Sequence, residues 1–493
     1  MRYKSTRDQN NIVTASQAIL QGLAVDGGLF VPTEFPSVEH DWNSLKEDSY
    51  QDLAFKILSI FIDDFSPEQL RHCIDSAYDE KFDTDLIAPI VEVDGHYHLE
   101  LFHGATIAFK DMALSILPYL MKTAAEINHN DNEIIILTAT SGDTGKAAMA
   151  GFSNVPGTKI IVFYPKGGVS SIQEQQMVTQ TGNNTYVVAV RGNFDDAQTK
   201  VKELFNDEAL KEELSQDGRQ FSSANSMNIG RLVPQVVYYF YAYAQLIKQG
   251  KIEVGQKINF SVPTGNFGNI LAAYYAKQIG LPINKLLCAS NDNTVLYDFF
   301  QSGTYDKNRE FKLTTSPSMD ILVSSNFERL VYHAINDNTE LLKDLMNQLN
   351  TKGSYTVPEE FQTAFKDFIG EFADMDETAE EIKEVYERTD YVMDPHTAVA
   401  SKAWRKANAK GLVDANSVIV STASPYKFPE AVLNALDIDT SKDSDEDLLN
   451  KLHAICKVPF PPAIDGLLEA KVLHDTVIEV DEMKTIVQEI AKK

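Results

Sequence analysis

Lys110 is the residue of this sequence whose type and setting best suit covalent chemistry. It lies in the stretch 100–113, and the following Asp-Met-Ala-Leu-Ser-Ile-Leu predicts that the lysine lies in the first turn of an apolar helix. The helix macrodipole disfavours a cation at that end and partial burial lowers the pKa of an amine, so the side chain is suited to form a Schiff base with an aldehyde. Taken alone, the stretch fits a surface lysine at a helix start better than a nucleophile.

Two loops have the composition of anion-binding sites. Residues 138–148 (Thr-Ala-Thr-Ser-Gly-Asp-Thr-Gly-Lys-Ala-Ala) and 262–269 (Val-Pro-Thr-Gly-Asn-Phe-Gly-Asn) each follow a strand pattern and open a helical one, so their backbone N–H groups point at a ligand. The first loop is not a nucleotide-binding P-loop, because Thr140 and Ala147 hold positions where that motif needs Gly and Ser or Thr. It suits a carboxylate or a small phosphate. The second lacks the three-glycine dinucleotide pattern and suits a monophosphate.

Short apolar runs predict the strands that would position these loops. The runs are continuous rather than alternating, and each is followed by a turn and a helical period, which indicates parallel sheets covered on both faces. The sequence therefore predicts an α/β fold with its chemistry on loops at strand ends. The runs are residues 134–138, 159–164, 186–190, 258–262, 285–289 and 417–421.

The change of pattern near residue 83 predicts a small N-terminal domain, residues 1–82, ahead of a catalytic region, residues 83–493. A smaller α/β subdomain is expected at about 110–215, and the remainder forms the larger subdomain and a C-terminal helical segment. Ser5, Thr6 and Arg7 are interpreted as a solvated N-terminus. Thr378 and Glu381 have the spacing of a capping box at the start of a helix.

Composition narrows the classes of ligand and compartment. The formal charge of −27 opposes binding to nucleic acid or to an anionic membrane, so an anionic ligand must meet a local cluster of cations. The three cysteines have no paired spacing, which argues against disulfides and against a zinc site, and no metal site is expected. The sequence starts without an apolar signal region and has no run long enough to span a membrane, so we expect a cytoplasmic protein.

A reactive lysine, a loop for a substrate anion and a loop for a cofactor phosphate together predict a pyridoxal-phosphate enzyme. With its flanking segments, the chain resembles the threonine synthase family, of the longer bacterial and fungal type, within the fold-type II pyridoxal-phosphate enzymes. This resemblance implies a tryptophan synthase β-like fold, with two α/β domains of mostly parallel sheets and a small N-terminal domain. The matching segments, in order, are 21–32, 101–111, 141–145, 164–168, 192–197, 225–231, 265–269, 316–322 and 394–397.

The resemblance implies a role for each matching residue. Lys110 would hold the cofactor covalently, and the Thr422 hydroxyl would contact the pyridine nitrogen, although a strand-end threonine is often only a cap. The cofactor phosphate would be bound by Gly265, Asn266, Phe267, Gly268 and Asn269. The substrate would be bound by Ser141, Gly142, Asp143, Thr144 and Lys146, and its phosphate by Asn225, Ser226 and Arg231, whose alternative interpretations are helix caps and a surface cation.

The implied reaction converts O-phospho-L-homoserine and water into L-threonine and phosphate, the last step of threonine biosynthesis. A related phospholyase that yields a keto acid and ammonia, or a non-catalytic phospho-ligand sensor on the same fold, are the alternatives. The expected partner is the small-molecule substrate alone, in a monomer or homodimer. Ala105 and Ser424 depart from the family pattern, and Ser424 is given no role. His103 and His396 are interpreted chiefly as structural residues.

Overall fold

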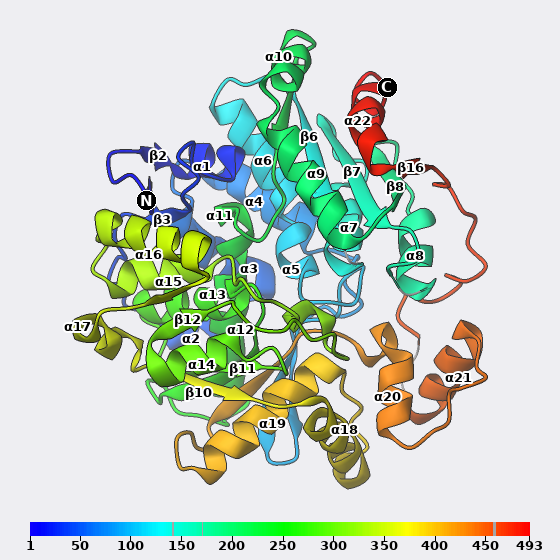
Figure 1. The fold of residues 1–493 in the computed structure, drawn as a ribbon. Coiled ribbons are helices and arrows are strands. Elements are labelled where there is room, and N and C mark those ends of the chain that lie inside the picture. The colour runs from blue at the N-terminus through cyan, green and yellow to red at the C-terminus, as the bar shows by residue number, and fades with distance from the viewer. Residues whose placement is uncertain (141, 170, 457–459) are drawn as a thin grey trace.

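The computed structural model describes residues 1–140, 142–169, 171–456 and 460–493. Two sheets flanked by helices form the body of the molecule, and the N-terminal elements pack against helices of both sheets (Figure 1). The six predicted strands are all present, which confirms the α/β fold with mostly parallel sheets.

The larger sheet has six strands, of which only β4, at one edge, is antiparallel to its neighbour. Helix α19 covers one face, where Val399, Ala400 and Ala403 pack against Leu287 and Ile419. Helices α12 and α13 lie on the other face. In sheet order the strands are β14 (Phe368–Phe372), β11 (Ile283–Ser290), β10 (Ile258–Pro263), β15 (Ser417–Ser421), β5 (His96–Glu100) and β4 (Ile90–Val93); the helices are α12 (Pro234–Lys248), α13 (Gly268–Gln278), α14 (Val295–Ser302) and α19 (Pro395–Ala409).

The smaller sheet has five parallel strands and is also covered on both faces. Ile135 and Ile161 face helices α9, α10 and α22, whereas Ile134 and Ile160 face α6 and α7, which explains the continuous apolar runs. In sheet order the strands are β16 (Val477–Glu479), β8 (Thr185–Arg191), β7 (Thr158–Pro165), β6 (Glu133–Ala139) and β9 (Arg219–Ser222); the helices are α6 (Leu117–Ile127), α7 (Asp143–Phe152), α8 (Ser171–Val178), α9 (Phe194–Asn206), α10 (Glu208–Gln216) and α22 (Met483–Ala491). The C-terminal segment thus returns to this sheet and supplies its edge strand.

The N-terminal residues are not solvated, so that interpretation of Ser5, Thr6 and Arg7 is wrong. Ser5 and Thr6 are fully buried, and Arg7 pairs with Glu328 at 2.7 Å, a partner that lies more than 300 residues away in the sequence. The segment forms an antiparallel sheet with its neighbours. The elements of this region are β1 (Arg2–Ser5), β2 (Ile12–Thr14), α1 (Ala15–Gln21), β3 (Phe30–Pro32), α2 (Trp42–Leu45), α3 (Tyr50–Phe61) and α4 (Pro67–Ala77).

The capping box predicted at Thr378 and Glu381 is also wrong. Helix α18 (Met375–Thr389) begins one turn earlier, where Asp374 and Glu377 form the reciprocal pair. Glu381 is instead buried and accepts hydrogen bonds from Ser401, at 2.6 Å, and from Arg405. The remaining elements are α5 (Asp111–Leu114), α11 (Ile229–Leu232), β12 (Thr304–Asp306), η1 (Pro317–Met319), α15 (Phe327–Ala334), α16 (Thr339–Lys352), β13 (Ser354–Thr356), α17 (Glu359–Gln362), η2 (Thr363–Phe365), η3 (Pro425–Lys427), α20 (Pro429–Ala435), α21 (Asp445–Cys456) and η4 (Val480–Glu482).

Within the described residues, no helix is long and apolar enough to cross a membrane.

Candidate active site

Lys110 is held against the end of strand β15 by backbone hydrogen bonds. The loop that leads from β5 to α5 pairs with the residues that follow β15: the Phe109 N–H donates to the Thr422 carbonyl at 2.8 Å, and the Ser424 N–H donates to the Ile107 carbonyl at 3.0 Å. Lys110 directly precedes helix α5 and has helical backbone angles. These contacts fix Lys110 next to Thr422, although more than 300 residues separate the two in sequence.

The loop before Lys110 has a strained and closely packed backbone. Ile107 adopts a φ of 52°, which is unusual for a β-branched residue and costs on the order of 1–3 kcal/mol. Asp111 closes the loop by accepting from the Thr106 N–H at 2.8 Å and from the Thr106 hydroxyl at 2.6 Å. A Cβ at Gly104 would lie 2.6 Å from the Cβ of Asp111, so the loop requires glycine there.

A small cavity surrounds the Lys110 amine. Nζ donates to the Ser318 hydroxyl at 3.3 Å and lies 3.9 Å from a carboxylate oxygen of Asp143. Ser318 itself donates to Asp143 at 3.3 Å, so the amine, hydroxyl and carboxylate form one cluster. The lining residues are Ala108, Phe109, Lys110, Asp143, Ser318, His396, Thr422 and Ala423.

Burial lowers the pKa of the Lys110 amine to about 8. The carboxylate of Asp143 opposes this shift, and the charges of Lys427 and Arg231 add to it. Lys427 is almost fully buried; its Nζ lies 3.4 Å from Asp143 and donates to the Thr106 carbonyl at 2.9 Å. Burial alone would raise the pKa of the Asp143 carboxyl, but the charges of Lys427 and Lys110 hold it well below its usual range. Asp143 therefore stays ionised between two lysines.

Two further cations lie close to this cluster. Burial and the charge of Lys427 lower the pKa of Lys146 to about 8, and its ammonium donates to the Gln180 side chain. Arg231 is buried, and burial lowers its pKa to about 10. Its Nη1 donates to the Ala224 carbonyl at 3.0 Å, but its buried Nε has no hydrogen-bond partner among the described residues. A buried guanidinium with one unsatisfied donor suits an anionic ligand.

His396 positions Ser318 and has a fixed tautomer. The Ser318 N–H donates to Nε2 at 3.2 Å, so Nε2 must be the unprotonated nitrogen. Nδ1 then carries the hydrogen and donates to Asp394 at 2.6 Å. Both ring nitrogens of His396 form hydrogen bonds, which favours a positioning role.

His103 lies between Asp83 and Glu100, at 2.6 and 2.9 Å. These two contacts raise the pKa of His103 to about 9 against the effect of burial.

The loop 265–269 presents unpaired amides at the start of helix α13. No acceptor among the described residues bonds the backbone N–H groups of residues 266–269. Phe267 adopts the left-handed conformation, with a φ of 65°. A Cβ at Gly265 would lie 2.3 Å from the Ser318 carbonyl oxygen, so the loop passes against the same residue that contacts Lys110. Asn269 accepts from Tyr238 and Tyr239, at 2.6 Å each, and its buried Nδ2 has no partner in the described part of the chain.

The structure brings most of the other predicted residues to the same region. Gly142 and Thr144 lie at the start of helix α7 beside Asp143, where the Gly142 N–H donates to Thr140. Ser141 lies outside the described residues. Ser226 contacts Asn326 at 3.4 Å, which in turn donates to the Asn266 carbonyl of the second loop. Asn225 precedes it, and its carbonyl accepts from Asn228.

Two residues of the cluster had no role in the sequence prediction. Ser318 lies in the segment 316–322, whose motif is part of the resemblance, but its contacts with Lys110, Asp143 and His396 come from distant elements. Lys427 lies five residues after Thr422 and looks like an ordinary surface lysine in sequence. Ser424, which received no role, accepts from the Tyr426 N–H and caps η3.

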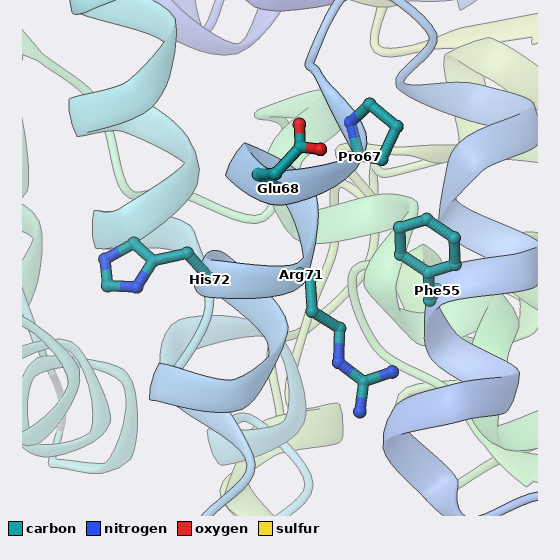
Figure 2. A pocket seen from close by; sticks show the side chains of 5 residues that line it. All are labelled: Phe55, Pro67, Glu68, Arg71 and His72. Carbon is teal, nitrogen blue, oxygen red and sulfur yellow. The ribbon is translucent and has the colours of Figure 1, made fainter.

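A second depression lies on the N-terminal domain between helices α3 and α4 (Figure 2). It is open to solvent and lined by Phe55, Pro67, Glu68, Arg71 and His72. Arg71 is engaged by Asp52 and Asp75, at 2.7 and 3.0 Å. Because none of these residues belongs to the Lys110 cluster, the chemistry is assigned to the buried cavity.

Three features fit one class of enzyme: a lysine of low pKa, the loop 265–269 with its unbonded amides, and a Thr422 hydroxyl that no described residue bonds. The model of the family "Pyridoxal-phosphate dependent enzyme" matches residues 87–424, and the chain is a pyridoxal-phosphate enzyme of fold type II. Models of "Threonine synthase N terminus" and "Threonine synthase, C-terminal" match residues 2–78 and 397–487.

The chain belongs to the threonine synthase family, whose function is pyridoxal-phosphate-dependent threonine biosynthesis. It is 36% identical to threonine synthase of Schizosaccharomyces pombe over 99% of this chain and 97% of that protein. Among solved structures, pyridoxal-phosphate-bound threonine synthase from Brucella melitensis superposes with a TM-score of 0.89 at 35% identity, and the yeast enzyme with 0.89 at 36%. These alignments cover all of this chain and 100% and 99% of the two structures. The predicted fold, family and cofactor are thereby confirmed.

Proposed function

We propose that this chain converts O-phospho-L-homoserine and water into L-threonine and phosphate at the Lys110 cavity. The observation that carries the proposal is the convergence of buried cations in an acidic protein. The side chains of Lys110, Lys146, Arg231 and Lys427 lie around two buried carboxylates, those of Asp111 and Asp143. A substrate with a phosphate and a carboxylate supplies the missing negative charge.

The residues that would hold pyridoxal phosphate are Lys110, the loop 265–269 and Thr422. The unpaired amides of residues 266–269 suit a phosphate at a helix N-terminus. Thr422 is buried at the cavity wall, and no described residue bonds its hydroxyl, so it can donate to a ring nitrogen. When bound, the cofactor supplies the electron sink for loss of a proton from the substrate.

Lys110 is proposed as the base that moves protons at the substrate carbons. With a pKa of about 8, about a tenth of its amines are unprotonated at pH 7, which suits removal of a proton from Cα. Once the ammonium has released that proton to solvent, the free amine can remove a proton from Cβ. The carboxylate of Asp143 stabilises the ammonium that forms, and the Ser318 hydroxyl holds the amine in place. The same ammonium can return a proton to Cγ after the phosphate departs.

The anionic groups of the substrate are assigned to two sets of residues. Arg231, with Asn225 and Ser226, would bind the phosphate, because the unpaired Nε of Arg231 is a buried donor that needs an acceptor. At the start of helix α7, Gly142 and Thr144 with Lys146 would bind the carboxylate, whereas the ionised Asp143 would face the Lys110 amine. Both groups would then be held by donors that are already in place before binding.

Product analysis tests this proposal. The purified protein with pyridoxal phosphate and O-phospho-L-homoserine should release equal amounts of threonine and phosphate. Release of 2-oxobutyrate with ammonia would assign the chain to the related phospholyases. Binding of the substrate without phosphate release would favour the non-catalytic sensor. Loss of all turnover in Lys110→Ala, with the fold retained, is the matched control.

We also propose the division into residues 1–82 and 83–493, with a smaller subdomain that starts near residue 110 and extends to about 215. The family models that end at residue 78 and start at residue 87 support the first boundary. A cytoplasmic location is supported by three free cysteines, Cys73, Cys288 and Cys456. The state of a monomer or homodimer is a prediction that light scattering can check.

A further inference from the structure

We propose that Arg329 is a positioning residue that couples the N-terminal domain to the loop 265–269. The inference rests on the proposed role of that loop as the binding site of the cofactor phosphate. Arg329 lies in helix α15, which Figure 1 shows beside β3 and α13, and it is the largest fully buried side chain of the described residues. It touches neither cofactor nor substrate in this scheme, so it acts only through other residues.

The guanidinium of Arg329 joins three segments that are distant in sequence. Nε donates to the Phe30 carbonyl of strand β3 at 2.8 Å, and Nη2 donates to the Met227 carbonyl at 2.6 Å, within the predicted substrate segment 225–231. Nη1 donates to the side-chain oxygen of Asn326. No carboxylate of the described residues forms an ion pair with this cation. Burying a charge costs free energy, and the hydrogen bonds of the Arg329 guanidinium offset this cost while they hold the three segments together.

Asn326 transmits this contact to the loop. Its backbone N–H and its side-chain Nδ2 both donate to the Asn266 carbonyl, at 3.0 Å each. Arg329 fixes the orientation of the amide, because Oδ1 must face the guanidinium and Nδ2 must then face Asn266. The Ser324 hydroxyl adds a bond of 2.7 Å to the Gly265 carbonyl. These bonds hold the carbonyls of Gly265 and Asn266, next to the amides of residues 266–269 that no described residue bonds.

The N-terminal residues hold the start of the same helix. Arg7 donates to both carboxylate oxygens of Glu328, at 3.1 and 2.7 Å, and the Thr6 hydroxyl donates to Glu328 at 2.7 Å. Glu328 directly precedes Arg329, so the contacts of Arg7, Thr6 and Phe30 converge on one turn of α15. The contacts of Thr6 and Arg7 thus have a role: they hold helix α15 in place, and α15 in turn holds the loop 265–269.

The test compares two ligands that differ only in the phosphate. Pyridoxal phosphate and pyridoxal share the aldehyde and the ring, so the ratio of their dissociation constants cancels the contribution of Lys110 and reports the phosphate site. The charge-preserving variant Arg329→Lys loses the planar fork and should weaken pyridoxal phosphate about tenfold, the effect of one lost buried hydrogen bond, and pyridoxal less than about twofold. Hydrogen exchange of the Asn326 amide, which donates to the Asn266 carbonyl, should be faster in the apoprotein.

A second variant, Glu328→Gln, does not contact the loop and distinguishes an effect of position from an effect of charge. Glu328→Gln removes a negative charge from the region, so a purely electrostatic effect would tighten pyridoxal phosphate. Loss of positioning should instead weaken it, by about threefold, because Gln cannot accept both bonds from Arg7 with full charge. The matched control is Arg71→Lys, near the N-terminus (Figure 2), whose ion pairs with Asp52 and Asp75 are exposed. It should leave both dissociation constants unchanged.

Asn269→Asp is the direct test of the loop and distinguishes the two possible failures. It removes the unpaired Nδ2 donor and should lower the preference for pyridoxal phosphate over pyridoxal. If this variant lowers the preference while Arg329→Lys and Glu328→Gln do not, the coupling is refuted and the phosphate loop stands. If Asn269→Asp leaves the preference unchanged, the phosphate role and the coupling both fail. Equal weakening of both ligands in Arg329→Lys would identify a general structural role and also refute the coupling.

Discussion

Lys427→Gln tests whether the low pKa of Lys110 depends on a neighbouring cation. Gln keeps donors that can reach the Thr106 carbonyl, so the change removes the charge and little else. Lys427 and Lys110 lie on either side of the Asp143 carboxylate, at 3.4 and 3.9 Å from its oxygens. Without Lys427, the repulsion is lost and Asp143 attracts the Lys110 ammonium with less competition. Both changes raise the pKa of Lys110.

The size of the shift follows from Coulomb's law. The contacts of 3.4 and 3.9 Å to one carboxylate allow a separation of about 8 Å between the two amines. At that separation and an effective dielectric of about 20, two unit charges repel by about 2 kcal/mol, or about 1.5 pKa units. A rise of about 1 to 1.5 units from about 8 lowers the unprotonated fraction at pH 7 by about ten- to thirtyfold. The loss should be recovered at higher pH, because there the amine is unprotonated in both proteins.

The assay is the rate at which the apoprotein becomes covalently linked to pyridoxal phosphate, measured against pH. This rate requires the free Lys110 amine and does not depend on the substrate. Its midpoint should move up by about 1 to 1.5 units in Lys427→Gln and stay near the original value in Lys427→Arg, which keeps the charge. An unchanged midpoint in Lys427→Gln would show that the charge of Lys427 does not lower the pKa of Lys110.

Four further outcomes can be checked. Borohydride reduction and peptide mapping should place the cofactor on Lys110; finding it on another lysine would refute the assignment. Arg231→Lys should weaken binding of O-phospho-L-homoserine by about 1–3 kcal/mol, measured by calorimetry, with less effect on the cofactor, because the planar fork is lost. Thr422→Val should weaken cofactor binding by about 1–3 kcal/mol and Thr422→Ser should not, if the hydroxyl donates to the ring. Gly265→Ala would place a Cβ 2.3 Å from the Ser318 carbonyl, so cofactor affinity should fall in a fluorescence titration even though unfolding stays cooperative.

The parts of the fold that the sequence predicted are those governed by local patterns. Continuous apolar runs identified six strands to within one or two residues, because a strand buried on both faces needs apolar side chains at every position. The prediction failed where a distant partner decides the outcome. Thr6 and Arg7 look solvated until Glu328 is brought beside them, and Glu381 looks like a cap until Arg405 reaches it.

The same limit applies to the candidate site. Lys110 and the glycine loops have recognisable local patterns, because a strand-to-helix turn that binds an anion needs particular residues at fixed spacing. Ser318 lies in the matching segment 316–322, but neither it nor Lys427 has a local pattern that predicts its contacts. Their importance lies in contacts that three or four separate elements create, and an isolated serine or lysine in sequence carries no sign of them.

The sequence predicted a lowered pKa for Lys110 partly from its place at a helix start, an effect that is small in the structure. A positive helix end was one of the two causes inferred from the sequence, but helix α5 is only four residues long, and so short a helix has little macrodipole. In the structure, burial lowers the pKa of Lys110 most, and the charges of Lys427 and Arg231 lower it further.

The contribution of Arg231 to the pKa of Lys110 has a consequence for the reaction. A dianionic phosphate beside Arg231 would offset that cation, raise the pKa of Lys110, and so favour the protonated amine once substrate is bound, whereas departure of the phosphate would lower the pKa again and help the ammonium to release its proton. The basicity of Lys110 would thus follow the occupancy of the phosphate site. If so, inorganic phosphate should shift the midpoint of covalent cofactor uptake to higher pH in the original protein and should have little effect in Arg231→Gln. An equal shift in both proteins would place the phosphate elsewhere.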